Sequence, residues 1–324
     1  MAAPLAGSSA PFFDDVADGP ANGAAWWVKT SDGVRIRVGY WPCDNARGTV
    51  FLMPGRTEFI EKYGTTAAEF GRRGYAVVTL DWRGQGLADR LFEDRRVGHI
   101  GKFLDYQKDV AGALELMEGL DLPGPLHLLG HSMGGAIGLR ALMNGLDVQS
   151  CVFTGPMWGI RMSPIVRPFG WALPRVAMMV GMGTKLAPST KYDFYVQANA
   201  FDGNMLTTDP DAYALMQRQL ATHPDLGLAG PSLVWLRESL SECYALSQMP
   251  APNVPCVTFV GEKEIIVDVP AIHTRMANWP GGALDVVPGA QHEVLLETPA
   301  LRKRIFDRIE ALFTDSGAAN VKRA

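Results

Sequence analysis

Short apolar runs that alternate with stretches of helical character constrain the fold of this 324-residue chain more than any other feature. The runs lack the polar alternation of a half-exposed strand, so they are typical of strands that are buried on both faces. Strands that alternate with helices predict a doubly wound α/β fold, with a mostly parallel twisted sheet flanked by helices. The apolar runs are residues 49–53, 75–80, 126–129, 151–153, 256–260 and 283–287. The candidate helices are residues 60–73, 103–119, 135–143, 272–277 and 299–313.

Two segments depart from this alternation. Residues 25–40 alternate in period two on both sides of Ser31-Asp32-Gly33, which predicts an antiparallel β-hairpin at the edge of the sheet. Residues 156–249 show no strand pattern but many Met, Pro and aromatic residues, and a structureless loop of that length is implausible in a compact domain. We interpret this segment as a helical lid inserted between core strands. The expected organisation is a flexible lead-in (1–24), an α/β core (25–155 and 250–315), the lid (156–249) and a C-terminal tail (316–324).

The charge and cysteine content exclude several classes of function. The net charge is −4 without any basic run, so a nucleic-acid partner is not expected. The four cysteines lack paired spacing, which argues against a zinc site or a disulfide framework and favours a reducing, cytoplasmic location. Residues 1–18 contain no Lys or Arg and no apolar stretch typical of a secretory signal. The apolar segment 168–184 is too short and too interrupted to span a bilayer.

The strongest motif is Gly130-His131-Ser132-Met133-Gly134, which joins an apolar run to a helical pattern. A G-x-S-x-G sequence between a strand and a helix is the context of a nucleophile elbow, a strained turn that presents the serine hydroxyl. The glycines are needed because side chains at their positions would collide with neighbouring backbone. Ser132 is therefore the candidate catalytic nucleophile.

A serine hydroxyl needs a histidine and an acid to become a good nucleophile, and in a fold of this type both follow the serine along the chain. His292 lies in a loop directly after the last predicted strand, a placement that the other five histidines lack. Glu264 and Asp268 both follow the strand at 256–260, and either carboxylate could orient the imidazole. We favour Glu264 for its position in the turn after the strand and keep Asp268 as the alternative acid.

A site of this kind also needs two backbone donors for the oxyanion. Gly55, in the turn after an early strand, would let the backbone approach a substrate closely, so the N–H groups of Arg56 and Met133 are the expected donors. The segment 81–86 begins like a dinucleotide fingerprint, but Asp89 stands at the position of the third glycine. The sequence contains no other metal-binding or nucleotide-binding spacing, so neither a metal nor a cofactor is expected.

Four segments carry a resemblance to known proteins: residues 53–63 (MPGRTEFIEKY), 81–86 (DWRGQG), 130–134 (GHSMG) and 289–292 (GAQH). Together they resemble the α/β-hydrolase superfamily, and more narrowly its bacterial lysophospholipase L2 and monoacylglycerol lipase branch. The resemblance implies a cofactor-independent serine hydrolase that uses Ser132, His292 and the backbones of Arg56 and Met133, with a lid that accommodates an acyl chain. The chain departs from this pattern at two points, because Pro54-Gly55 replaces the usual His-Gly of the oxyanion loop and Glu264 replaces the usual Asp of the acid turn.

The resemblance and the apolar lid together predict the substrate class. We expect carboxylic esters of lipids, either lysophospholipids or monoacylglycerols, to be cleaved through an acyl-serine intermediate. Met157, Trp158 and Trp171 are the expected contacts of the acyl chain, because thioethers and aromatic faces suit variable alkyl chains. Three arginines of the lid, which we call the lid arginines, could attract a phosphate head group or an anionic membrane surface. Contact with such a surface would place the protein transiently at the inner face of the membrane. The lid arginines are Arg161, Arg167 and Arg175.

Three alternatives stay open at this level. They are a short-chain carboxylesterase or thioesterase, a peptidase of the prolyl aminopeptidase kind, and a non-enzymatic module that binds a ligand under the lid. The preferred acyl-chain length would distinguish a short-chain esterase, and activity on proline-terminated amides would identify a peptidase. Covalent labelling by a fluorophosphonate would exclude a non-enzymatic module. The sequence does not indicate an oligomeric state.

Overall fold

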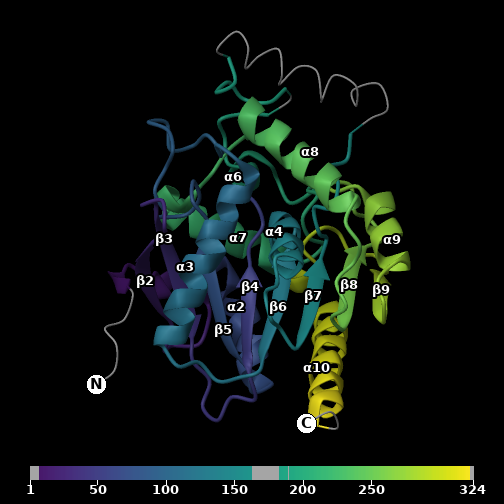
Figure 1. The fold of residues 1–324 in the computed structure, drawn as a ribbon. Helices are drawn as coiled ribbons and strands as arrows, with labels where there is room; N and C mark the ends of the chain where they lie inside the picture. The colour runs from purple at the N-terminus through teal and green to yellow at the C-terminus, as the bar shows by residue number, and fades with distance from the viewer. Residues whose placement is uncertain (1–6, 163–181, 189, 322–324) are drawn as a thin grey trace.

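The computed structural model describes residues 7–162, 182–188 and 190–321. Within these residues nine strands form one sheet in the order β1-β2-β3-β5-β4-β6-β7-β8-β9 (Figure 1). The strands from β5 to β9 in this order run parallel to one another, and the pairs at the β1 edge are antiparallel. The strands are β1 (Gly7–Ala10), β2 (Ala24–Lys29), β3 (Arg35–Trp41), β4 (Thr49–Met53), β5 (Ala76–Asp81), β6 (Leu126–His131), β7 (Ser150–Thr154), β8 (Cys256–Gly261) and β9 (Gly282–Val287).

The predicted apolar runs form the centre of this sheet. Every residue of β4, β5, β7 and β8 is buried, as expected for strands covered on both faces. Side chains alternate between the faces: Phe51 and Met53 of β4 belong to one core cluster, and Val50 and Leu52 belong to another. The mostly parallel, doubly wound α/β sheet predicted from the sequence is confirmed.

Helices cover the two faces of the sheet. Buried side chains of α3, α4, α8 and α9 join the first core cluster, and those of α2 and α10 join the second. The α-helices are α1 (Asp14–Ala17), α2 (Gly64–Arg72), α3 (Tyr106–Gly119), α4 (Met133–Met143), α6 (Tyr195–Ala198), α7 (Pro210–Thr222), α8 (Leu233–Ser247), α9 (Val269–Ala277) and α10 (Pro299–Val321). The 3-10 helices are η1 (Ile60–Tyr63), η2 (Phe103–Asp105), η3 (Pro224–Leu226) and η4 (Val294–Leu296).

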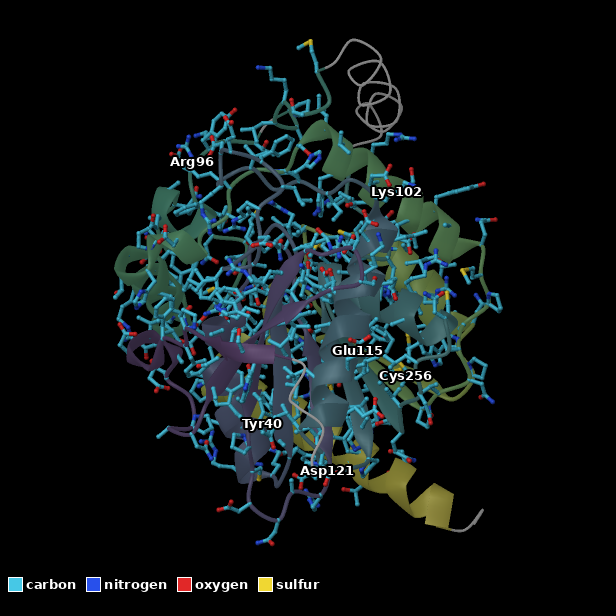
Figure 2. All side chains as sticks on the ribbon, turned by 60° about the vertical axis from the view of Figure 1, so that its left-hand side comes forward. Tyr40, Arg96, Lys102, Glu115, Asp121 and Cys256 are labelled. Atoms are coloured by element: carbon cyan, nitrogen blue, oxygen red, sulfur yellow. The ribbon has the colours of Figure 1, made fainter. Side chains whose placement is uncertain are left out.

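The carboxyl ends of the parallel strands meet at one edge of the sheet. The register pairs Met53 of β4 with Gly130 of β6, and His131 of β6 with Thr154 of β7. The turns that follow these strands therefore lie side by side, which is where open α/β sheets bind their ligands. Figure 2 shows Arg96 and Lys102, from the loop between β5 and η2, at the end of the molecule that carries α8, with Asp121 toward the other end.

The segment between β7 and β8 is helical where the structure describes it, and contains α6, α7, η3 and α8. Helix α8 lies above α4 in Figure 1 and contacts it. None of the helices in the described part of the chain is long and apolar enough to cross a membrane.

Both ends of the chain differ from the expectation of a flexible lead-in and a tail. Residues 7–10 form β1, which pairs with β2 from Gly7 to Ala10, and α1 follows with Val16 and Ala17 buried. Strand β2 supplies hydrogen bonds to β1, the edge strand, that no pattern within the first residues indicates. At the other end α10 continues from Pro299 to Val321, so residues 316–321 extend a helix.

Candidate active site

Ser132 occupies a sharp turn between β6 and α4. Its backbone has φ 50° and ψ −116°, a conformation that costs on the order of 1–3 kcal/mol for a residue other than glycine. The flanking glycines permit the turn, because a Cβ atom at Gly134 would lie 1.9 Å from the carbonyl oxygen of Met53, and one at Gly130 would lie 2.9 Å from that of Gly134. Ser132 remains partly accessible although its neighbours in α4 are buried. The turn has the form of a nucleophile elbow.

His292 and Glu264 are brought together from separate loops at the same edge of the sheet. The His292 Nδ1 atom lies 2.6 Å from Glu264 Oε2, and both residues are buried. The ring packs against Gly155, where a Cβ atom would come within 3.0 Å of His292 Nδ1. His292 and Ser132 line the same cavity. The remaining ring nitrogen, Nε2, is therefore the one available for proton exchange with a reacting group.

Glu264 is held as a carboxylate in a fixed orientation. Its Oε1 atom accepts hydrogen bonds from the backbone N–H groups of Ile266, at 2.5 Å, and Val267, at 3.1 Å. Burial alone would raise the pKa of Glu264, but the hydrogen bond to His292 and these two backbone donors lower it below its ordinary value. One oxygen therefore faces the imidazole and the other faces the backbone.

Asp268 takes a different place. It precedes α9 as its N-cap residue, and its backbone N–H donates to the carbonyl oxygen of Gly159 at 3.0 Å. Its side chain packs beside Gly159, where a Cβ atom would lie 2.7 Å from the Asp268 Cβ. The structure therefore brings Glu264, and not Asp268, to the imidazole of His292.

The turn after β4 lies against the elbow. A Cβ atom at Gly55 would lie 2.9 Å from Glu58 Oε2 and 3.1 Å from the Ser132 Cβ, so the missing side chain lets this turn lie close to the elbow. Among the described residues, neither the backbone N–H of Arg56 nor that of Met133 finds a hydrogen-bond acceptor. Met133 is also the first residue of α4, where the helix presents free N–H groups and a positive dipole end.

Two residues of the segment after β5 support this turn. Trp82 donates from Nε1 to the carbonyl oxygen of Pro54 at 2.9 Å, and Gln85 donates from Nε2 to that of Gly55 at 3.1 Å. Gln85 also accepts through Oε1 from the backbone N–H of Thr57 at 3.1 Å. The segment that begins like a dinucleotide fingerprint therefore fixes the loop that carries Arg56.

A second buried polar cluster lies next to these residues. Lys62 Nζ donates to Glu58 Oε1 at 2.5 Å and to Glu293 Oε1 at 2.7 Å. Glu58 Oε2 also accepts from the Tyr63 hydroxyl and from the backbone N–H of Gly55. His131 Nε2 lies 3.3 Å from Glu293 Oε2, and its other ring nitrogen lies 2.9 Å from the Thr154 hydroxyl. The cluster thus connects the turn after β4 to the residue that follows His292.

The charges of this cluster stabilise one another. Burial alone would lower the pKa of His131, but the carboxylates of Glu293 and Glu58 raise it above its ordinary value. Burial alone would raise the pKa of Glu293, but Lys62 and His131 hold it well below its usual range. Glu58, His131 and Glu293 have ligand atoms within 4.8 Å of one another, a grouping that could hold a metal ion. Because the Lys62 ammonium already bridges the two carboxylates, we assign no metal to it.

A cavity of about 440 Å³ opens above Ser132 and His292. Much of its lining is apolar and comes from the third core cluster and the segment between β7 and β8. The apolar lining residues include Phe59, Phe194, Val196, Met205, Leu206, Met216 and Leu220. Such a lining suits an alkyl chain.

The expected acyl-chain contacts are placed elsewhere or are not described. Met157 and Trp158 are buried in the first core cluster and are absent from the described lining of this cavity. The Trp158 indole stacks on Trp279 at 6.1 Å between ring centroids and donates from Nε1 to the carbonyl oxygen of Gly135 at 3.1 Å. Trp171 lies outside the described residues.

Comparisons with known proteins agree with this geometry. The family described as Serine aminopeptidase, S33, matches residues 44–299. The chain is 30% identical over 312 residues to the lysophospholipase L2 of Escherichia coli (strain K12), with 90% of this chain and 88% of the relative covered. This chain belongs to the S33 serine aminopeptidase family.

Solved structures show the fold of this S33 family member. A soluble variant of monoglyceride lipase from Saccharomyces cerevisiae has a TM-score of 0.68 at 21% identity, with 88% of this chain and 93% of that chain covered. The alpha/beta hydrolase GrgF from Penicillium sp. sh18 has a TM-score of 0.64 at 17% identity, with 91% and 99% covered. The fold is the α/β-hydrolase fold, and the resemblance inferred from the sequence motifs is confirmed.

Sequence reasoning missed the buried cluster of this family member. Lys62 and Glu293 lie 231 positions apart along the chain, and neither they nor Glu58 stand in a motif that indicates burial. One signal was available, since Glu58 follows Gly55 closely and Glu293 follows His292. A charged residue beside each of two loops of one site indicates that the two side chains lie close together.

Proposed function

We propose that the protein hydrolyses carboxylic esters of lipids, lysophospholipids or monoacylglycerols, through an acyl intermediate on Ser132. The chain is a carboxylic ester hydrolase of the lysophospholipase and monoglyceride lipase type, as the names of its relatives indicate. The observation that carries the mechanism is the 2.6 Å contact between His292 and Glu264 at a cavity that also contains the partly accessible Ser132.

In this mechanism His292 Nε2 takes the proton of the Ser132 hydroxyl as its oxygen attacks the ester carbonyl carbon. Glu264 keeps the proton on Nδ1 and stabilises the imidazolium that forms. The backbone N–H groups of Arg56 and Met133 donate to the oxyanion of the tetrahedral intermediate. The intermediate collapses, the alcohol leaves with the proton from His292, and the acyl group remains on Ser132. A water molecule, deprotonated by His292, then attacks the acyl-enzyme, and His292 returns the proton to the Ser132 oxygen as the fatty acid leaves.

The apolar cavity supports an acyl chain as the group that enters it. Residues from the segment between β7 and β8, among them Phe194, Met205 and Met216, face the same cavity as Ser132. Flexible thioethers and aromatic rings accept alkyl chains of different length. We therefore propose that residues 156–249 act as a lid over the ester site.

The test compares Ser132→Ala with the wild type for fluorophosphonate labelling and for release of fatty acid from monoacylglycerols of increasing chain length. A matched control is Ser239→Ala, because Ser239 is buried in α8 and its hydroxyl has no hydrogen-bond partner in the described structure. We expect Ser132→Ala to lose labelling and turnover and Ser239→Ala to keep both. Labelling of Ser132→Ala would contradict the assignment of the nucleophile. Wild-type activity confined to short acyl chains or to proline-terminated amides would replace the proposed substrate.

A further inference from the structure

Arg56, in the proposed oxyanion loop, lines the cavity above Ser132. Its Nη1 donates to the carbonyl oxygen of Ala229 at 2.7 Å, and the guanidinium carbon lies 5.4 Å from the ring centre of Trp235. Within the described residues no carboxylate lies at ion-pair distance from it, and Ala229 is the one hydrogen-bond acceptor it has. Its Nε and Nη2 atoms have no hydrogen-bond acceptor among the described residues.

Protein surrounds this cation on most sides. Arg56 is only partly accessible, and it lines the cavity that contains Ser132 and His292. Burial lowers the pKa of Arg56 to about 10, so the side chain still carries its charge at neutral pH. An enclosed charge without a partner is costly, and most buried charges in proteins are paired. The arrangement is typical of a site whose counter-charge arrives with the ligand.

The other positively charged groups of the cavity wall already have carboxylate partners. Lys62 also lines the cavity, but its ammonium bridges Glu58 and Glu293. His292, which also lines the cavity, faces the carboxylate of Glu264 through Nδ1. Among the described lining residues, Arg56 is thus the one cation that has no carboxylate partner.

The position of Arg56 along the proposed reaction site matches a lysophospholipid. Its backbone N–H is a proposed donor to the ester oxyanion, so its side chain starts beside the reacting carbonyl. In a lysophospholipid the phosphodiester is joined to the ester through the glycerol carbons, whereas a monoacylglycerol carries a neutral hydroxyl at that place. A guanidinium presents a planar set of donors that fits two phosphate oxygens.

We propose that the Arg56 guanidinium binds the phosphodiester of the substrate, and that the enzyme therefore prefers lysophospholipids to monoacylglycerols. This inference rests on the proposed function, because it places the ester carbonyl at Ser132. The anion it names is the phosphate of the bound substrate, not the charge of a lipid surface or free phosphate.

The experiment measures kcat/KM for hexanoyl lysophosphatidylcholine and for hexanoyl monoglycerol, both below their micelle concentrations so that no lipid surface is present. The readout is the ratio of the two values, because a disturbance of the oxyanion loop affects both substrates and cancels. For Arg56→Met we expect the ratio to fall about 10- to 100-fold, the range for a charge-assisted hydrogen bond. Arg56→Lys keeps a point charge and should recover part of the ratio.

Two further variants separate the sources of an effect. Arg218→Met removes an exposed arginine of α7 that pairs with Asp18, and should leave the ratio as in the wild type. Arg161→Met removes the described member of the lid arginines. A fall in the ratio for Arg161→Met, with none for Arg56→Met, would overturn the proposal.

A second measurement uses the wild type alone and so does not depend on the folding of a variant. Glycerophosphocholine should inhibit hydrolysis of hexanoyl monoglycerol competitively, at concentrations at least tenfold below those at which glycerol or inorganic phosphate inhibits. Equal inhibition by inorganic phosphate would mean a general anion site, and equal inhibition by glycerol would mean no phosphate site. Either result overturns the proposal.

The outcomes also distinguish this inference from the proposed function. An unchanged ratio in Arg56→Met, with both substrates still cleaved, rejects this inference and leaves the assignment as an ester hydrolase intact. Failure of the wild type to cleave either ester rejects the proposed function as well.

Discussion

Replacing Glu264 by glutamine tests the proposed acid with a change of a single atom. The two oxygens of Glu264 have different partners: Oε1 accepts from the backbone N–H groups of Ile266 and Val267, and Oε2 faces His292 Nδ1. In Glu264→Gln the amide oxygen must take the backbone side, because an NH₂ group there would face two donors. The NH₂ group then faces the imidazole.

The consequence is a change of histidine tautomer. An NH₂ group at 2.6 Å from Nδ1 forces this nitrogen to accept, so the proton moves to Nε2 and His292 can no longer take a proton from Ser132. Other Ser-His-acid enzymes lose about ten-thousandfold in kcat when the acid becomes an amide. We expect a loss of about a thousandfold to ten-thousandfold here, which corresponds to about 4–5.5 kcal/mol of activation free energy.

The assay is kcat on a short-chain monoacylglycerol, with thermal unfolding as the control for the fold. Asp268→Asn is the matched variant, because it makes the same chemical change four residues along the chain, and we expect it to lose less than tenfold. A larger loss in Asp268→Asn than in Glu264→Gln would refute the reasoning and make Asp268 the acid. Near wild-type kcat in a folded Glu264→Gln would show that Glu264 does not orient His292 during turnover.

Three other predictions concern the packing around the site. Lys62→Met leaves Glu58 and Glu293 buried without their cation and should reduce the free energy of unfolding by about 3–5 kcal/mol in a urea titration, whereas Lys303→Met, which breaks an exposed pair, should change it by less than about 1 kcal/mol. Because the pKa of Glu293 is depressed in the folded state, its ionised form stabilises the protein above the unfolded-state pKa of about 4.3, and this contribution is lost as the pH falls. The difference in melting temperature between the wild type and Glu293→Gln should therefore be largest near neutral pH and shrink below about pH 4; a difference that grows on acidification would contradict this sign. Gly134→Ala places a Cβ atom 1.9 Å from a β4 carbonyl oxygen and should abolish fluorophosphonate labelling, and a labelled, folded variant would show that the elbow tolerates a side chain.

The central strands were predictable because the apolar composition of each run indicates that the strand is buried. The expected run 49–53 coincides with β4, and the run 256–260 differs from β8 by one residue. β1 was not predictable in this way, since Gly-Ser-Ser-Ala has no apolar pattern and becomes a strand only through hydrogen bonds to β2. Strand formation at a sheet edge is a property of two segments, and the pattern of one segment does not contain it.

The candidate site shows the same division. The elbow at Ser132 could be inferred because its geometry depends on glycines within two positions of it. The acyl-chain contacts could not be inferred in this way, because an apolar side chain is equally stable in a cavity wall and in a core. Trp158 illustrates this ambiguity, since its indole packs against Phe153 and Trp279 and is absent from the described lining of the cavity above Ser132.

The buried cluster explains how two distant segments keep one geometry. Lys62 joins Glu58, in the turn that carries Arg56, to Glu293, which follows His292 and lies 231 positions from Lys62. Buried ion pairs add little to stability compared with apolar packing, because desolvation offsets their attraction. They are strongly directional, however, and a catalytic site depends on the relative placement of its donors and its base to within about 0.5 Å. The cluster is therefore better understood as the element that fixes the oxyanion turn against the histidine loop than as a source of folding free energy.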